Sequence, residues 1–147
     1  MRFGVAAFVV VALLAPACGG GGGSSPAAPT PQTLEGTWRA TKAQFVSVNN
    51  ASRQVDIVAQ GSTLTLVFSG TNYTRTMTEP GQPPDVQTGT WSASTDVMTL
   101  RPSGVTWSIQ FEMTFNGNSL TLNGGSVEFD FTGNFEQAKL YMTLVRQ

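Results

Sequence analysis

The segment from Val105 to Phe115 has the clearest hydrophobic pattern in the chain, because large apolar and polar residues alternate in it without a break. Alternate side chains of a β-strand point to opposite faces, whereas the same spacing on a helix scatters the apolar residues around the circumference. The pattern therefore predicts one long antiparallel strand with a buried face and a solvent-facing one. Its expected inward residues are Val105, Trp107, Ile109, Phe111, Met113 and Phe115.

Shorter alternating segments lie on both sides of this strand and are separated by turn residues. Asn116-Gly117 is a strong signal for a two-residue hairpin, and Asn123-Gly124-Gly125 is expected to turn the chain again. The proline-containing segment from Glu79 to Asp85 is expected to be a loop. The other segments expected to be strands are 63–69, 73–78, 86–93, 97–101, 119–122, 127–131 and the end of the chain.

The first strand of the folded part has a break in its alternation. Trp38 begins a strand that runs toward Val48, but Phe45 falls on the opposite parity from Trp38. A β-bulge between them would bring both side chains to one face of the sheet. Further on, residues 55–59 fit a strand and a helical turn equally well, so the sequence leaves their structure open.

Eight to ten short strands, with no helix of useful length, predict an all-β domain over residues 34–147. Strands with one apolar face must close on themselves or stack as two sheets. Short sequential connections favour an up-and-down antiparallel meander that closes into a barrel over a Greek-key sandwich. Threonine on the expected outer faces argues against contact with lipid, so we expect a soluble barrel.

The residues before this domain read as an export signal followed by a spacer. Arg2 precedes an apolar run from Phe3 to Leu14, and small residues follow immediately before Cys18, the only cysteine. The segment Leu14-Ala15-Pro16-Ala17-Cys18 resembles the bacterial lipobox, whose cysteine is lipidated and becomes the N-terminal residue after cleavage. We expect a signal peptide at residues 1–17, a lipid anchor on Cys18, and a Gly-, Ser- and Pro-rich tether at residues 18–33.

The residue after the cysteine bears on the expected location. Gly19 stands where, in the Gram-negative lipoproteins that this segment resembles, an aspartate favours retention in the inner membrane. The resemblance therefore implies anchoring in the outer membrane, facing the periplasm or the cell surface. The alternative is an ordinary signal peptide with an accidental cysteine.

Composition excludes several classes of function. Eight Lys and Arg against nine Asp and Glu, with no basic run, argue against binding of nucleic acid. The absence of histidine removes Cys/His zinc sites, Ser-His-Asp catalysis and Cys-His catalysis. Glu128 and Asp130 resemble a catalytic carboxylate pair, but their parity places them on the solvent-facing side. Asp56, Tyr73 and Arg75 form no recognisable constellation, so we expect neither an enzyme nor a metal or cofactor.

Two Gly-Thr-Trp motifs and a late arginine resemble the bacterial lipocalin-like domains. The motifs are Gly36-Thr37-Trp38 and Gly89-Thr90-Trp91, and the arginine is Arg146. Lipocalins open with Gly-x-Trp, and an arginine late in the barrel packs over that tryptophan at the closed end. The resemblance implies that Arg146 stacks on Trp38, a cation–π contact worth about 1 kcal/mol. It also implies that the barrel binds a small apolar molecule.

The side chains expected to point inward form either the wall of a ligand cavity or a packed core. Small barrels are nearly filled by side chains or hold one small ligand, and the many bulky residues favour a mostly filled interior. We favour a carrier of a small apolar molecule at the cell envelope. The alternatives are a protein-binding module, such as a periplasmic inhibitor of a protease or lysozyme, and a structural envelope protein with a filled barrel. The candidate lining residues are Leu64, Leu66, Phe68, Trp107, Ile109, Phe111, Met113, Phe115, Phe129, Phe131 and Met142.

Overall fold

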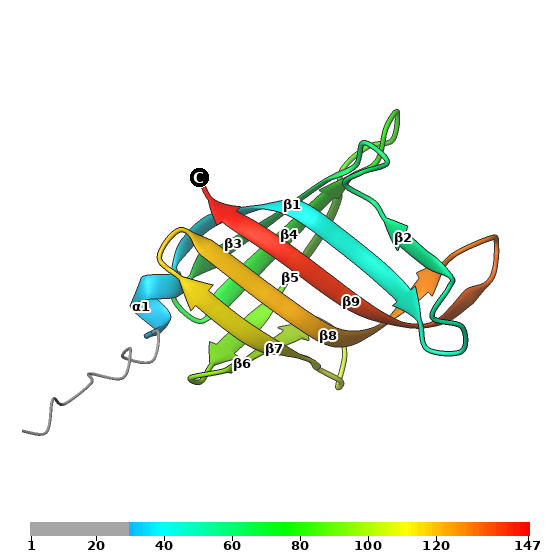
Figure 1. Cartoon of the computed structure of the whole chain (residues 1–147). Coiled ribbons are helices and arrows are strands. Elements are labelled where there is room, and N and C mark those ends of the chain that lie inside the picture. Colours follow the sequence, from blue (N-terminus) through cyan, green and yellow to red (C-terminus); the bar gives the residue numbers. More distant parts are fainter. Residues whose placement is uncertain (1–29) are drawn as a thin grey trace, which may run out of the picture.

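A computed structural model describes residues 30–147 of the chain, as a barrel of antiparallel strands (Figure 1). The expected signal peptide, Cys18 and most of the expected tether lie outside these residues. The elements are α1 (Pro31–Leu34), β1 (Gly36–Ser47), β2 (Gln54–Asp56), β3 (Thr63–Ser69), β4 (Asn72–Thr78), β5 (Asp85–Ala93), β6 (Val97–Pro102), β7 (Ile109–Asn116), β8 (Ser119–Asp130) and β9 (Phe135–Arg146).

The strands follow one another around the barrel in the order of the sequence. The order is β2-β1-β3-β4-β5-β6-β7-β8-β9, and a further antiparallel pairing of β1 with β9 closes the ring. Eight strands thus form the barrel, and β2 pairs with the second half of β1 as an additional strand. The predicted all-β, up-and-down barrel is confirmed. No helix in this described part of the chain is long and apolar enough to cross a bilayer.

The strand expected from Val105 to Phe115 is shorter in the structure. β7 begins at Ile109, which pairs with Leu100 of β6, and β6 ends at Pro102. Residues 103–108 form the connection between these two strands and belong to no strand themselves. The predictions that Val105 and Trp107 point inward were wrong, since both are exposed and Trp107 keeps 52% of its surface accessible.

The turn expected at Asn123-Gly124-Gly125 is a β-bulge inside one continuous strand. The register of β8 against β9 shifts between Leu122 and Gly125, so the strand continues to Asp130 instead of turning. The bulge changes which parity faces inward, from Leu122 before it to Val127 after it. A side chain at Gly125 would collide with the ring of Phe111, 2.1 Å from an added Cβ, which explains why glycine stands there.

The bulge expected in the first strand is present. The register of β1 against β9 shifts between Ala40 and Lys42, and Trp38 and Phe45 are both buried on the inner face. For residues 55–59 both alternatives are partly correct. β2 ends at Asp56, whose Oδ1 accepts hydrogen bonds from the backbone N–H groups of Val58 and Ala59 and so starts a turn.

One end of the barrel is closed by α1 and by the pair Trp38 and Arg146. The indole N–H of Trp38 donates a 2.8 Å hydrogen bond to the carbonyl of Leu34, at the end of α1. The Arg146 guanidinium lies 4.4 Å from the ring centroid of Trp38 and donates to the carbonyls of Thr33 and Glu35. The predicted stacking of Arg146 on Trp38 is confirmed. The folded part begins slightly before the expected boundary at Leu34, because Thr33 belongs to this closure.

The glycines of both Gly-Thr-Trp motifs allow close packing. An added Cβ at Gly36 would lie 2.8 Å from Nη1 of Arg146, and one at Gly89 would lie 2.1 Å from the carbonyl oxygen of Arg101. The tryptophan of the second motif, Trp91, is buried with its ring centroid 4.7 Å from that of Phe68. Both motifs therefore allow close packing of side chains and backbone in the barrel wall and at its closed end.

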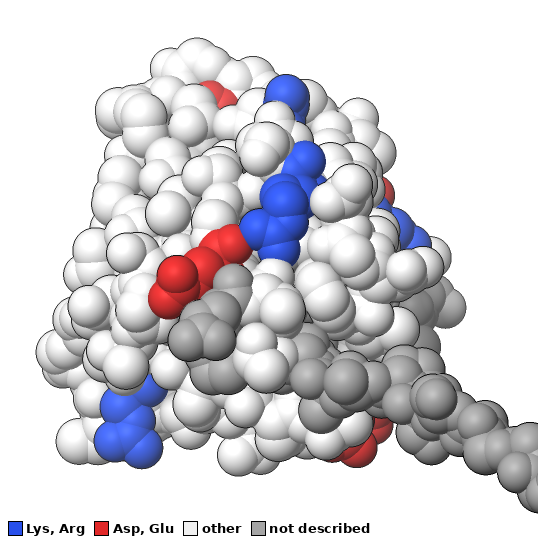
Figure 2. Space-filling view, turned by 90° about the vertical axis from the view of Figure 1, so that its left-hand side faces the viewer, with Lys and Arg blue, Asp and Glu red and all other residues white. Residues whose placement is uncertain are grey.

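Charged side chains are sparse on the surface at the closed end. Figure 2 shows this side of the molecule, where a few Lys and Arg residues lie scattered among mostly uncharged residues. The described residues visible on this face form no continuous basic patch of the kind that binds the phosphate backbone of nucleic acid.

Candidate ligand-binding cavity

A cavity of about 510 Å³ occupies the half of the barrel that lies away from α1. Its lining reaches Glu79, Asp130 and Phe135, next to the β4–β5 and β8–β9 loops. These loops lie at the end of the barrel away from α1 (Figure 1). The sequence favoured a mostly filled interior. The structure differs, because the barrel is filled only toward the closed end, where Phe68, Trp38 and Phe115 pack. The cavity is lined by Phe45, Leu64, Leu66, Tyr73, Arg75, Met77, Glu79, Gln87, Leu100, Ile109, Phe111, Val127, Glu128, Phe129, Asp130, Phe135, Leu140 and Met142.

Most of the cavity wall is apolar, and every barrel strand contributes to it. β3 supplies Leu64 and Leu66, and β7 supplies Ile109 and Phe111. Near the mouth, the ring of Phe45 stacks on that of Phe129 with their centroids 3.9 Å apart. Every second side chain of a strand points to the same face of the sheet, and in a closed barrel one face of every strand is the interior. The inward residues of consecutive strands therefore meet here. The wall can therefore bury the apolar surface of a bound molecule.

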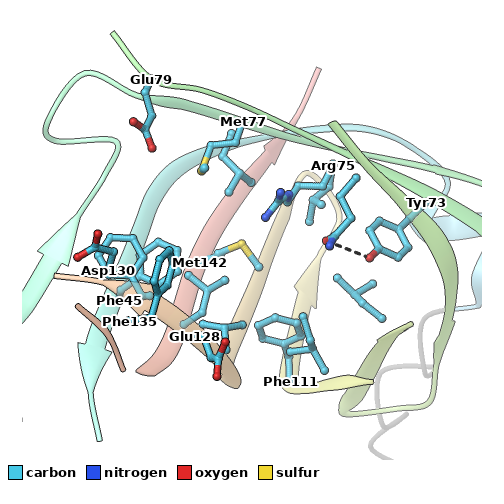
Figure 3. A pocket seen from close by; sticks show the side chains of 18 residues that line it. Phe45, Tyr73, Arg75, Met77, Glu79, Phe111, Glu128, Asp130, Phe135 and Met142 are labelled. Carbon is cyan, nitrogen blue, oxygen red and sulfur yellow. Dashed lines mark hydrogen bonds between the residues drawn. The ribbon is translucent and has the colours of Figure 1, made fainter. Parts of the chain in front are cut away.

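Polar side chains gather on one part of the wall, on β4 and β5. Figure 3 shows Arg75 pointing into the cavity, with Tyr73 beside it. Arg75 pairs in register with Leu66 of β3 on one side and with Gln87 of β5 on the other. The Tyr73 hydroxyl donates a long, 3.4 Å hydrogen bond to the side-chain oxygen of Gln87. Burial raises the pKa of Tyr73, although the nearby positive charge of Arg75 opposes this shift.

Arg75 has an incomplete set of partners among the described residues. Its Nη2 forms an ion pair with Asp85, whose side chain is 58% exposed, whereas that of Arg75 is 29% exposed. Its Nε is buried and has no hydrogen-bond acceptor. A buried donor without an acceptor is unfavourable, because its hydrogen bonds to water are lost and not replaced.

The mouth combines carboxylates with one exposed aromatic ring. Glu79, Asp130 and Phe135 lie at the rim (Figure 3), and Phe135 is 76% exposed. Asp130 accepts hydrogen bonds from the backbone of Thr132 and Gly133 and so holds the β8–β9 turn. Glu128, also exposed, is within 3.4 Å of the Gln137 amide on the neighbouring strand. These carboxylates thus serve as turn or surface groups at the edge of the cavity.

Two neighbouring strands of the barrel wall, β7 and β8, stop pairing beside the cavity. Pairing of β7 with β8 ends at Glu112 and Asn123, beyond which the two strands have no mutual register. A second hollow of about 380 Å³ lies here, and Phe111 lines both this hollow and the main cavity. The Phe111 ring, packed over Gly125, therefore forms the partition between the cavity and the side of the barrel.

The predicted lining residues fall into three groups. Leu64, Leu66, Ile109, Phe111, Phe129 and Met142 line the cavity. Phe68, Met113, Phe115 and Phe131 do not. Phe68 and Met113 are buried core residues, Phe115 packs edge-on against Trp38 at 6.1 Å, and Phe131 packs against Phe129. Trp107 is exposed in the β6–β7 connection.

The sequence reasoning missed the polar group of Tyr73, Arg75 and Gln87. The structure brings these residues together through the pairing of β4 with β5, although no constellation was expected. The available signal was an arginine on the same face of the predicted strand 73–78 as Tyr73 and Met77. In the part of the chain that the structure describes, no group of three or more Asp, Glu, Cys or His residues could hold a metal ion.

The fold and the cavity define a class: small up-and-down barrels with one closed end and an apolar interior that opens at the other. The lipocalin-like domain family matches residues 34–122 of the chain, more than half of its length, and the protein belongs to this family. Comparisons with curated proteins and with solved structures find no match.

Proposed function

We propose that this protein binds a small, mainly apolar molecule inside its barrel. The observation that carries the proposal is the cavity of about 510 Å³, which lies within the range of roughly 300–1,000 Å³ typical of ligand pockets. Its wall is mostly apolar, and one polar group on β4 and β5 provides orientation. A molecule that enters would exchange water for the side chains of Leu66, Phe111 and Met142, a transfer that favours binding in proportion to the apolar area buried.

The closed end supports a binding function. Trp38, Arg146 and α1 fill the far side of the barrel, so the cavity has a fixed floor. Phe45 and Phe129 stack on each other near the mouth and so hold each other's rings in place. A site that is formed in advance binds with little cost in ordering side chains.

We propose further that the protein is anchored in the cell envelope by a lipid on Cys18. The support is the N-terminal sequence, in which a positive start, an apolar run and small residues lead to this cysteine. The ligand would then be a molecule present at the envelope. Stable anchoring requires more than one acyl chain, because a single chain holds a protein only marginally.

The test of ligand binding is a titration with a fluorescent apolar probe. The full chain, a Leu64→Trp variant and a Thr65→Trp variant are compared, since Leu64 lines the cavity and Thr65 is its neighbour of opposite parity in β3. Because all three chains share the same N-terminal segment, any binding to that segment is equal among them. We expect saturable binding by the wild type and by Thr65→Trp, and weaker binding by Leu64→Trp because the larger ring fills the cavity.

The contrary result is equally clear. If circular dichroism shows that all three chains are folded and the probe binds them equally, the cavity is not the binding site. The proposal would then fail, and the search would turn to protein partners of the barrel.

A further inference from the structure

We propose that the ligand is a carboxylic acid with an apolar tail, and that Arg75 binds its carboxylate. This inference rests on the proposed function and names the chemical class of the ligand. The observation behind it is the asymmetric wall of the cavity. β4 and β5 supply Tyr73, Arg75 and Gln87, whereas the remaining strands supply mainly aliphatic and aromatic side chains.

The cost of placing Arg75 in the cavity wall is only partly offset by its ion pair with Asp85. A guanidinium keeps its positive charge at all physiological pH values, so it cannot avoid the cost of burial by losing a proton. In this cavity it faces apolar side chains, and its buried Nε has no acceptor among the described residues. Its ion-pair partner, Asp85, is the more exposed of the two side chains and approaches only Nη2. The guanidinium therefore keeps donor capacity for a second anion.

The neighbours of Arg75 favour a carboxylate as that anion. Arginine and carboxylate groups match in geometry and form strong, charge-assisted hydrogen bonds. The Tyr73 hydroxyl lies on the same face of β4, and it would exchange its long, 3.4 Å hydrogen bond to Gln87 for one to the carboxylate. Arg75 is the single cation among the residues that line the cavity and already pairs with Asp85, and the carboxylates of Glu79 and Asp130 lie at the rim. A singly charged headgroup is repelled less by these carboxylates than a phosphate with a higher charge.

The depth of Arg75 sets the orientation of the ligand. Arg75 is opposite Leu66 in register, and Met77, the next inward residue toward the mouth, is opposite Leu64. The acid group would thus lie against the wall of β4 and β5, part of the way into the barrel. The tail would lie against Ile109, Phe111 and Met142 across the cavity. Asp85 competes with the ligand for Arg75, so removing its charge strengthens acid binding.

The experiment compares acids and alcohols of equal chain length as competitors of the fluorescent probe. Decanoic, tetradecanoic and octadecanoic acids and the corresponding alcohols are tested on the full chain and on Arg75→Met, Asp85→Asn and Arg39→Met. Arg39 is an exposed arginine of β1 and serves as the matched control. We expect Arg75→Met to weaken the best acid by about tenfold or more, as loss of a hydrogen bond to a charged group does, and to leave the alcohols unchanged. Asp85→Asn should strengthen acid binding, and Arg39→Met should have no effect.

The outcomes separate this inference from the proposed function. If alcohols compete as well as acids in the wild type and Arg75→Met changes neither, the carboxylate proposal is overturned while the apolar cavity stands. If the probe binds but no acid displaces it, the proposal is also overturned. If the folded wild type does not bind the probe at all, the proposed function fails first. Asp85→Asn keeps the proposal testable even if Arg75→Met does not fold, because weaker acid binding by Asp85→Asn would contradict it.

Discussion

At the scale of single residues, Trp38 combines burial with a hydrogen bond, a cation–π contact and an aromatic contact. Its side chain is fully buried, its N–H is bonded to the carbonyl of Leu34, and Arg146 lies over its ring. Phe115 contacts it edge-on from β7 with ring centroids 6.1 Å apart. One indole thus joins α1, the first strand, the seventh and the last, and these contacts cannot be replaced by a smaller side chain.

Replacing Trp38 by alanine should therefore lower the free energy of unfolding by about 3–5 kcal/mol, as truncation of a core aromatic does. Chemical denaturation followed by circular dichroism measures this change. Glu128→Gln is the matched comparison, because Glu128 is exposed on β8, and its effect should stay within about 0.5 kcal/mol. Equal effects of the two substitutions would contradict the assignment of inner and outer faces.

Tyr73 gives a prediction about pH. Burial raises its pKa in the folded protein above the ordinary value of 10.0, with the charge of Arg75 opposing the shift. The stability that depends on neutral Tyr73 is therefore fully present below pH 10.0 and is lost as the pH rises through the folded-state pKa. In a Tyr141→Phe variant, Tyr73 is the only tyrosine, and its phenolate absorbance should appear with a midpoint above 10.0 while the protein is folded. A midpoint below that value would contradict the burial of the hydroxyl.

At the scale of elements, the bulge in β8 determines the wall of the cavity. It moves the inward positions from Leu122 to Val127 and places Gly125 directly under the ring of Phe111. Without the extra residue, Val127 and Phe129 would point away from the cavity. The bulge thus shapes both the lining and the partition formed by Phe111.

Substitution of Gly125 by alanine should displace the Phe111 ring, because the added methyl group would lie 2.1 Å from the ring carbon Cε1. We expect a loss of about 1–3 kcal/mol in the free energy of unfolding, as overpacking costs. Binding of the apolar probe should change as well, since Phe111 lines the cavity. Ser126→Ala, at an exposed position of the same strand, is the control. If the two variants have the same stability and bind the probe equally, Phe111 is not held by Gly125.

The two bulges show what a sequence can reveal about an element. The bulge in β1 could be predicted, because Trp38 and Phe45 are both large and apolar and have opposite parity. The bulge in β8 could not, because Asn123-Gly124-Gly125 has the composition of a turn and only the pairing with β9 decides between them. The prediction that the strand begins at Val105, before Ile109, was wrong for a related reason. Alternation indicates which side chains share a face but does not show whether a partner strand reaches that far.

The same distinction applies to the candidate site. Apolar lining residues such as Leu64, Leu66 and Phe111 follow from parity, because a closed barrel brings all inward positions together. The polar group could not be predicted, because it depends on the register that places Arg75 opposite Gln87 and on which half of the barrel is filled. Whether a barrel is hollow depends on the volumes of facing side chains, and these are unknown until the register is known.

At the scale of the whole molecule, the two ends of the barrel have different roles. α1 lies at the closed end, so the chain that precedes Pro31 joins the molecule on the side opposite the mouth (Figure 1). The expected anchor would therefore leave the mouth accessible.

The anchor itself can be tested by cell fractionation. We expect the wild-type protein to be found with the membrane fraction and a Cys18→Ser variant to be released, because only the thiol accepts the lipid. Mass spectrometry of the mature N-terminus should show acyl groups on Cys18 in the wild type. Release of both proteins in equal amounts would contradict lipid anchoring and favour an ordinary signal peptide.

The pairing that closes the ring also constrains how the chain is made. β9 contributes the hydrogen-bonding partners of both β1 and β8, although β1 is synthesised first and β9 last. Until β9 has been synthesised, β8 has an open edge, the first half of β1 pairs only with β3, and Trp38 has no arginine to cover it. Contacts between the two extremes of a chain form slowly, and open strand edges bind to other chains. The barrel can therefore close only after β9 has been synthesised, and until then the edges of β8 and β1 that β9 covers are open to pairing with other chains.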